Sequence, residues 1–336
     1  MASPGTEAAA ISALAAGARG RTGWRERFGL TPLGPALRDA RKAIVGQPGS
    51  PPAEWGVSSL KIFKPRLSFA AWLGRTREDG LVPVYNFFNR TRRPKDAAYS
   101  VRVTDCRDFQ GGRWTYDSHN GTDFAAPVGT PLVTAASGKV LRVACDLDRG
   151  GLKVCVDHGD GLFATYSHMA RTCVREGELV RRGDPIGLSG ASGVEIVLFF
   201  PWVAPHLHLN VWLGGEAVDP FAAAGETSLW RTANAPVPHE GGDDGLREFM
   251  PSEWDPDGVA ASIEACRDPK VKAQCLRYEA LERRAAEVLF HRVMNSAAFA
   301  TFPPLYRRFA ERAPRLDLPF RARDYRGAWL PPPGSE

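Results

Sequence analysis

The residues with the clearest chemical potential are histidines, and five of the seven in the chain lie between positions 119 and 208. Two of them belong to the segment HLHLNVWL at 206–213, in which polar and apolar residues alternate strictly. Because side chains alternate between the two faces of a β-strand, His206 and His208 are predicted to point the same way, with their Cα atoms roughly 6 to 7 Å apart. Two imidazoles at that spacing can serve one small centre, one as a metal ligand and the other as a proton carrier.

A second candidate element is the motif HNGTD, in which a turn-forming Asn-Gly pair lies between His119 and Asp123. Zinc binds imidazole nitrogen and carboxylate oxygen, and a catalytic zinc has three protein ligands and leaves one position to water. His119, Asp123 and one histidine of HLH would complete such a set. The residues alone therefore predict a metal site and leave open which HLH histidine is the ligand.

A third element is the segment LFATYSHM at 162–169. A strand period of two places Ala164, Tyr166 and His168 on one face. We therefore expect Tyr166 and His168 to project into the same cleft.

Together these motifs resemble the lysostaphin/LytM-type zinc endopeptidases, which cleave peptide bridges in bacterial cell walls. The resemblance covers about the middle third of the chain, ends at the VDP motif at 218–220, and follows the family's order. It implies a small, mainly antiparallel β domain with one zinc ion per chain at the floor of a long open groove. The segments that carry it are HNGTD, GTP, GKV, HGDG, TYSHM, VRRGDPIGLSG and PHLHLNV.

The resemblance also implies roles for single residues. His119, Asp123 and His208 correspond to the zinc ligands of the family. His206 and His168 correspond to its two catalytic histidines.

The implied chemistry is hydrolysis of peptide bonds in peptidoglycan cross-bridges by a zinc-activated water. We expect His206 to orient or deprotonate this water, and His168, supported by Tyr166, to donate to the oxyanion; the two histidines could exchange these roles. The alternative is a latent or non-enzymatic module that binds cell wall or activates other wall hydrolases.

Two departures from the family pattern concern the substrate side. Between Gly190 and His206 the chain inserts the apolar segment GVEIVLFFPWVAP. For its residues 196–202, a buried strand, a lid over the groove and an exposed membrane-touching loop are the alternatives, and a buried strand is expected. After HLH, Leu209 and Asn210 replace the aromatic and acidic residues that are common in the family.

The elements around these motifs divide the chain into four parts. Breaker-rich residues 1–100 predict an irregular N-terminal extension, and short β-type runs with glycine turns predict the peptidase-like β domain at 101–225. Residues 226–250 form a predicted linker, and 251–336 a helical region. Its apolar residues recur at helical spacing from Val271 to Val293 and predict one core-facing stripe.

The remaining histidines and the cysteines are predicted to be structural. His158, His239 and His291 are expected in packing or surface roles. The six cysteines are too few for a disulfide scaffold, so buried thiols are the default expectation. Disulfides between Cys145 and Cys155 or between Cys266 and Cys275 stay open alternatives.

Composition excludes several classes of protein. With 43% hydrophobic and 24% charged residues, the chain is predicted to be globular. Its net charge of +5 is scattered along the chain and fits an acidic polymer as well as no such partner. No nucleic-acid partner is expected. The most apolar stretch, at 196–205, is half the length of a membrane helix, and the N-terminus lacks the pattern of a signal peptide. A peptidoglycan substrate implies the periplasm, cell envelope or exterior, and the cytoplasm stays an alternative.

Overall fold

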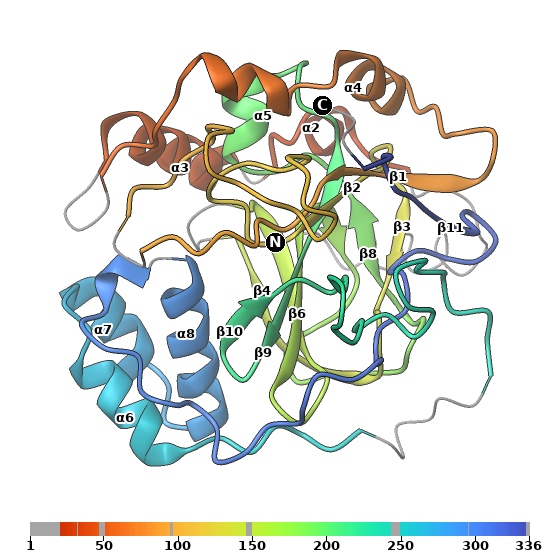
Figure 1. Ribbon diagram of the computed structural model, residues 1–336. Helices are drawn as coiled ribbons and strands as arrows, with labels where there is room; N and C mark the ends of the chain where they lie inside the picture. Colours follow the sequence, from red (N-terminus) through yellow and green to blue (C-terminus); the bar gives the residue numbers. More distant parts are fainter. Residues whose placement is uncertain are drawn as a thin grey trace.

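The structure is a computed structural model and describes residues 21–31, 33–46, 51–94, 97–145, 150–242, 249–294 and 296–333. A sheet lies at its centre, with one group of helices from the N-terminal part and another from the C-terminal part (Figure 1). The strands are β1 (Leu81–Asn86), β2 (Thr122–Ala125), β3 (Pro131–Val133), β4 (Gly138–Ala144), β5 (Leu152–Asp157), β6 (Leu162–Thr172), β7 (Leu179–Val180), β8 (Pro185–Ser189), β9 (His206–Leu213), β10 (Glu216–Val218) and β11 (Gly327–Trp329).

The sheet is antiparallel almost throughout, which confirms the predicted fold class. Its strands follow the order β11-β1-β2-β9-β6-β5-β4-β7, while β10 pairs with β9, and β8 pairs with β3 and β6. The β1–β11 pair is parallel. The long central strands β6 and β9 pair over six positions, from Leu162 opposite Leu213 to Ser167 opposite His208.

The main core lies on one face of this sheet. Leu207, Leu209 and Val211 alternate into it from β9, as the sequence pattern predicts, because a strand directs every second side chain to the same side. The same core holds Phe124 of β2 and Trp230, both fully buried. The polar positions of β9 consequently face the other side of the sheet.

The N-terminal part differs from the predicted irregular extension. Its helices are α2 (Trp24–Arg27), α3 (Leu33–Val45), the 3-10 helix η1 (Val57–Ile62) and α4 (Pro65–Trp72). Strand β1 pairs with β2, with Val84 opposite Phe124 and Asn86 opposite Asp123. The predicted boundary at residue 100 therefore separates a strand from the sheet to which it belongs.

The C-terminal part begins with helices but does not stay helical. It contains α6 (Pro256–Glu264), α7 (Pro269–Leu276), α8 (Leu281–Met294) and the 3-10 helix η3 (Ser296–Ala298), and it returns to the sheet as β11. The stripe predicted from Val271 to Val293 is divided between α7 and α8, with the break at 277–280. Asp255 and Asp268 are the N-caps of α6 and α7, and their side chains accept hydrogen bonds from backbone N–H groups of the first turn.

These C-terminal helices pack on the face of the sheet opposite the main core. The side chains of Phe163 and Trp212 project from the sheet on this side and form a second hydrophobic cluster with Val288 and Leu289 of α8. Cys266 and Cys275 lie in the same cluster as free thiols, so the structure does not join them by a disulfide.

The apolar insert is not the buried strand that the sequence analysis expected. It begins as the short helix α5 (Val194–Phe199), which lies among the N-terminal helices (Figure 1). The Phe199 ring contacts those of Trp55 and Phe63 at centroid distances of 4.7 and 5.7 Å. N-terminal partners far away in the sequence therefore decide the structure of the insert.

Candidate metal centre

The site is built on two paired strands and the turn before one of them. Asp123 of β2 lies opposite His208 of β9 in the antiparallel register. His119 precedes β2 by three residues, and the turn that carries it passes close to His208. A Cβ on Gly121 would lie 2.7 Å from His208 Nε2 and 2.7 Å from the Leu209 carbonyl oxygen, so only glycine fits there.

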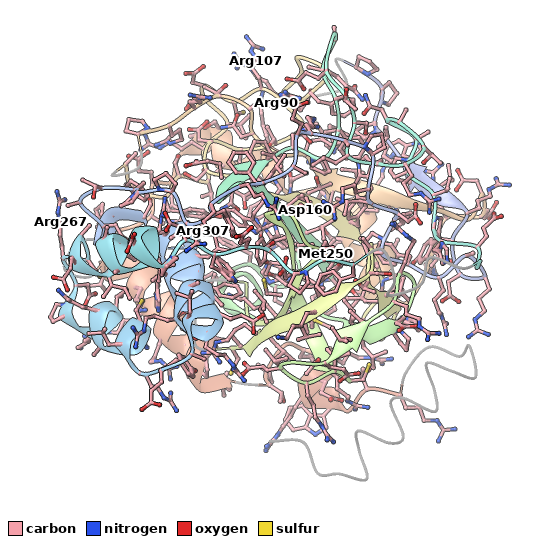
Figure 2. All side chains as sticks on the ribbon, turned by 90° about the horizontal axis from the view of Figure 1, so that it is seen from below. Arg90, Arg107, Asp160, Met250, Arg267 and Arg307 are labelled. Carbon is pink, nitrogen blue, oxygen red and sulfur yellow. The ribbon has the colours of Figure 1, made fainter. Side chains whose placement is uncertain are left out.

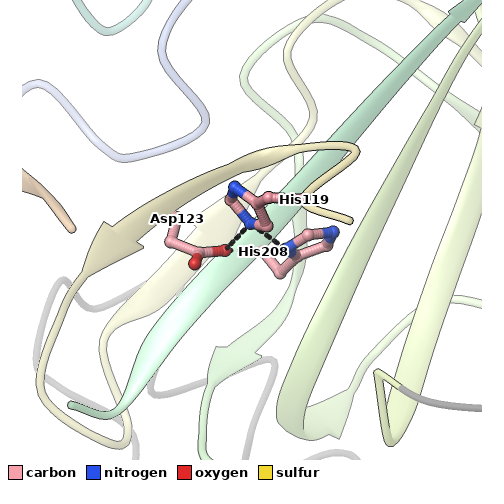
Figure 3. A group of neighbouring side chains, drawn as sticks. All are labelled: His119, Asp123 and His208. Carbon is pink, nitrogen blue, oxygen red and sulfur yellow. Dashed lines mark hydrogen bonds and ion pairs between the residues drawn. The ribbon is translucent and has the colours of Figure 1, made fainter. Parts of the chain in front are cut away.

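Three side-chain atoms converge at this point (Figure 3). His208 Nδ1 lies 2.6 Å from Asp123 Oδ1, and His119 Nε2 lies 3.1 Å from the same oxygen. The two ring nitrogens are 3.2 Å apart. Two imidazole nitrogens and one carboxylate oxygen at such distances form a donor set of the kind that binds a metal ion.

Neighbouring backbone and side-chain groups orient two of these residues. His119 Nδ1 donates to the Phe87 carbonyl oxygen at 2.5 Å, which leaves the lone pair on Nε2, the atom directed at Asp123. Asn86 Nδ2 donates to Asp123 Oδ2 at 2.9 Å. Asn86 is not among the site residues predicted from the sequence, although the run LVPVYN at 81–86 is rich in β-forming residues and has the composition of a strand.

His206 and His168 lie beside this trio. Their ring centroids are 4.6 Å apart, and His206 Nε2 lies 3.6 Å from Asp123 Oδ1. Each ring donates through Nδ1 to a backbone carbonyl at 2.7 Å, His206 to Ala204 and His168 to Ser192. In each ring, Nε2 therefore carries the lone pair and can accept a proton.

The placement of Tyr166 contradicts the sequence prediction. Between its pairings with Val154 and Leu152 of β5, strand β6 carries one extra residue, and His168 in this bulge has a φ of 60°. The bulge turns His168 to the side of the sheet that holds the site, while Tyr166 stays in the main core. The Tyr166 hydroxyl accepts a bond from the Ala135 N–H at 2.8 Å, so the expectation that Tyr166 and His168 share a cleft is wrong.

Burial and charge together shift the pKa values of Asp123, His208 and His168. Burial by itself would raise the pKa of Asp123, but the nearby histidines hold that pKa well below its usual range. Burial lowers the pKa of His208, which Asp123 offsets only in part, and burial together with the other histidines lowers the pKa of His168. An ionised carboxylate and neutral imidazoles are the states in which these groups bind metal.

A cleft of about 850 Å³ leads to the site. His119, His168 and His208 line it together with Asn120 and Asn210. Its walls include residues 88–94 and 97–99, Val293 of α8 and Ser296 of η3. His206 lies beneath Tyr85, whose ring stacks on it at a centroid distance of 5.8 Å.

The other histidines lie outside the site. His158 is buried and hydrogen-bonds through Nδ1 to the Ser137 carbonyl oxygen, and burial lowers its pKa to about 3. His239 Nδ1 lies 3.4 Å from Asp317 Oδ2. In α8, His291 Nε2 lies 3.7 Å from Glu287 Oε2. Their placement agrees with the packing and surface roles that were expected.

Comparison with known proteins identifies the class of domain that carries this site. Residues 117–220 match Peptidase family M23, so the chain contains a domain of that family. The match includes all five of the residues that surround the site, namely His119, Asp123, His168, His206 and His208.

Individual relatives are similar over the same region. The peptidoglycan DD-endopeptidase ShyA of Vibrio cholerae is 36% identical over 105 residues, which is 31% of this chain and 23% of that protein. An uncharacterized metalloprotease of Haemophilus influenzae is 34% identical over 103 residues, 31% of this chain and 20% of that protein. The chain thus spans less than a quarter of the length of either relative.

Among solved structures, the catalytic domain of lysostaphin from Staphylococcus simulans is 31% identical. The similarity covers 33% of this chain and 80% of that domain, with a TM-score of 0.27.

Proposed function

We propose that this protein is a zinc-dependent metalloendopeptidase that hydrolyses peptide bonds in peptidoglycan cross-bridges. The observation that carries the proposal is the convergence of His119, Asp123 and His208 beside the adjacent rings of His206 and His168. The names of relatives such as ShyA support peptidoglycan as the substrate. Such a substrate implies a location in the periplasm, in the cell envelope or outside the cell.

The residues present fit zinc. Two imidazole nitrogens and one carboxylate oxygen, with all three ligand atoms within 4.8 Å of one another, form a three-ligand set of the kind that a catalytic zinc site uses. When bound, zinc would lower the pKa of a water molecule towards about 7, so that hydroxide forms at neutral pH. The Phe87 carbonyl and Asn86 would keep His119 and Asp123 in orientation.

The roles of His206 and His168 follow from their hydrogen bonds. Both rings have Nδ1–H bonded to a carbonyl, so each can accept a proton only through Nε2. We assign His206 as the base that takes the proton of the attacking water, because its Nε2 is 3.6 Å from Asp123. His168 can donate to the oxyanion or to the leaving amine only after its own Nε2 has gained a proton.

The test combines zinc content with release of peptide ends from isolated sacculi. His208→Ala should lose both zinc and hydrolysis, whereas His206→Ala should keep one zinc per chain and lose hydrolysis. His239→Ala, which changes an imidazole outside the site, is the matched control and should keep both. If His208→Ala and His206→Ala still hydrolyse sacculi, the assignment fails.

A latent form of the same enzyme is a second candidate, favoured by the burial of the site. His119, Asp123, His168 and His206 are each no more than 4% exposed, and Tyr85 covers His206. Two hydrogen bonds hold α4 to the insert, from Ser68 Oγ to the Trp202 carbonyl oxygen and from Trp72 Nε1 to the Val203 carbonyl oxygen.

Breaking those two bonds tests latency. Removal of residues 1–100 would not do so, because it also removes β1 and Asn86. The double variant Ser68→Ala/Trp72→Phe should hydrolyse sacculi faster than the unchanged protein if α4 limits access to the site. An unchanged rate with unchanged zinc content would argue against latency.

A further inference from the structure

The large apolar side chains that are exposed to solvent gather in one part of the structure. Of the seventeen such side chains among the described residues, twelve belong to 24–73 or 200–202. The other five are scattered over the rest of the molecule, as is normal for a soluble surface. The gathered set is Trp24, Phe28, Leu33, Leu37, Ile44, Val45, Val57, Leu60, Phe69, Leu73, Phe200 and Trp202.

Aromatic rings form two groups at the centre of this region, and we name their five members the aromatic patch. Phe28 and Trp72 both contact Phe200, with ring centroids 5.7 and 5.0 Å apart. Phe69 contacts Trp202 at 5.8 Å, and it lies three residues before Trp72 on the same side of α4. Phe200 and Trp202 are each 48% exposed, so the patch is open to solvent.

Helix α3 extends the apolar surface. It packs against α5, the helix that directly precedes Phe200 (Figure 1). Leu33, Leu37 and Ile44 are spaced by four and seven residues, so they lie along one side of α3, and all three are exposed. Among the described residues, none covers this row of apolar side chains and shields it from water.

Exposed basic side chains lie in the same segment of the chain as these apolar groups. Among the described residues between 21 and 75, eight basic side chains are exposed and no acidic side chain is. The three acids of this range, Glu26, Asp39 and Glu54, are buried or half-buried. The exposed basic residues are Arg21, Arg25, Arg27, Arg38, Arg41, Lys61, Arg66 and Arg75.

We propose that the aromatic patch docks this protein on the surface of a bilayer that contains anionic lipids. Phenylalanine and tryptophan enter the boundary between headgroups and acyl chains, while arginine and lysine beside them bind anionic headgroups. A second copy of the chain is a poorer occupant, since two such faces would bring like charges together. The docking surface includes none of the histidines of the metal centre, and the proposal does not depend on catalysis.

The test is sedimentation of the purified full chain with vesicles. The chain should bind vesicles of phosphatidylglycerol and phosphatidylcholine more tightly than vesicles of phosphatidylcholine alone, and binding should weaken as salt rises. Phe69→Ser/Trp202→Ser should reduce binding about tenfold or more, because it removes two half-exposed rings together. Leu179→Ser/Leu276→Ser, which removes two half-exposed leucines outside the patch, is the matched control and should bind normally.

A pair of charge variants tests the electrostatic part. Arg66→Glu, on α4, should weaken binding to the anionic vesicles several-fold. Arg267→Glu, at the outer edge of the C-terminal helices, should not (Figure 2).

Three outcomes would overturn the proposal. The first is a chain that does not sediment with anionic vesicles, or a patch variant that binds them as tightly as the unchanged chain. The second is a dimer by light scattering that Phe69→Ser/Trp202→Ser converts to monomer without any vesicle binding, which would assign the patch to a second copy. The third is a monomer that does not bind vesicles and in which the backbone amides of α3 exchange slowly with solvent. This result would mean that another segment of the same chain covers the aromatic patch.

Discussion

Asn86→Ala should weaken zinc binding about 10- to 100-fold, because Asn86 orients a proposed ligand from the neighbouring strand. Its Nδ2 donates to Asp123 Oδ2 at 2.9 Å, and both side chains are buried. A hydrogen bond to a charged group contributes about 1.5–3 kcal/mol, which corresponds to about one to two powers of ten in affinity. Loss of a hydrogen bond to a metal ligand has an effect of the same size.

The assay is competition for zinc between the full chain and a chromophoric chelator at pH 7.5. Asn234→Ala is the matched control, since Asn234 donates to the Ala222 carbonyl oxygen at 2.8 Å, away from the site, and this variant should keep the affinity of the unchanged chain. An affinity of Asn86→Ala within about twofold of the unchanged chain would refute the reasoning, because Asp123 would then be held without Asn86.

Three further predictions concern other residues. His158 is buried with a pKa of about 3, below the usual value of 6.5, so its contribution to stability is present above pH 6.5 and is lost as pH falls towards 3. The free energy of unfolding, measured with urea, should therefore fall by about 2 kcal/mol more between pH 7.5 and pH 5 in the unchanged protein than in His158→Gln. An equal fall in both proteins would contradict this. Tyr166→Phe should lower stability by about 1–3 kcal/mol, because the Ala135 N–H loses its partner, yet leave hydrolysis of sacculi unchanged. A large loss of turnover without loss of stability would instead indicate that Tyr166 takes part in catalysis. Gly121→Ala should displace His208 and lower zinc affinity on the order of tenfold or more in the chelator assay, whereas unchanged affinity would show that the turn can yield.

Local pattern was sufficient where a feature depends on neighbouring residues of one strand. The alternation in HLHLNVWL predicts that His206 and His208 share a face, and both rings do approach Asp123 Oδ1. The same alternation sends Leu207 and Leu209 into the core. Period and polarity are properties of the strand itself, so no knowledge of its partners was needed.

The same pattern failed where a strand is irregular. Strict alternation would place Tyr166 and His168 on the same face of β6. The bulge in this strand instead directs Tyr166 into the core and His168 towards the site. A bulge depends on the register with the adjacent strand, which the sequence of β6 alone does not specify. The break between α7 and α8 inside one helical stripe is another case, since residues of both helices share one cluster with residues of the sheet.

The sequence by itself determined the types of side chain available for the site, their order along the chain, and the antiparallel β domain that carries them. Tertiary structure decided which of them meet. It brought Asn86 of β1 to Asp123, turned His168 towards His206 and withdrew Tyr166 into the core. It also folded the apolar insert against the N-terminal helices. These outcomes come from contacts between residues far apart in the chain, and the free energy of such contacts overrides local preference.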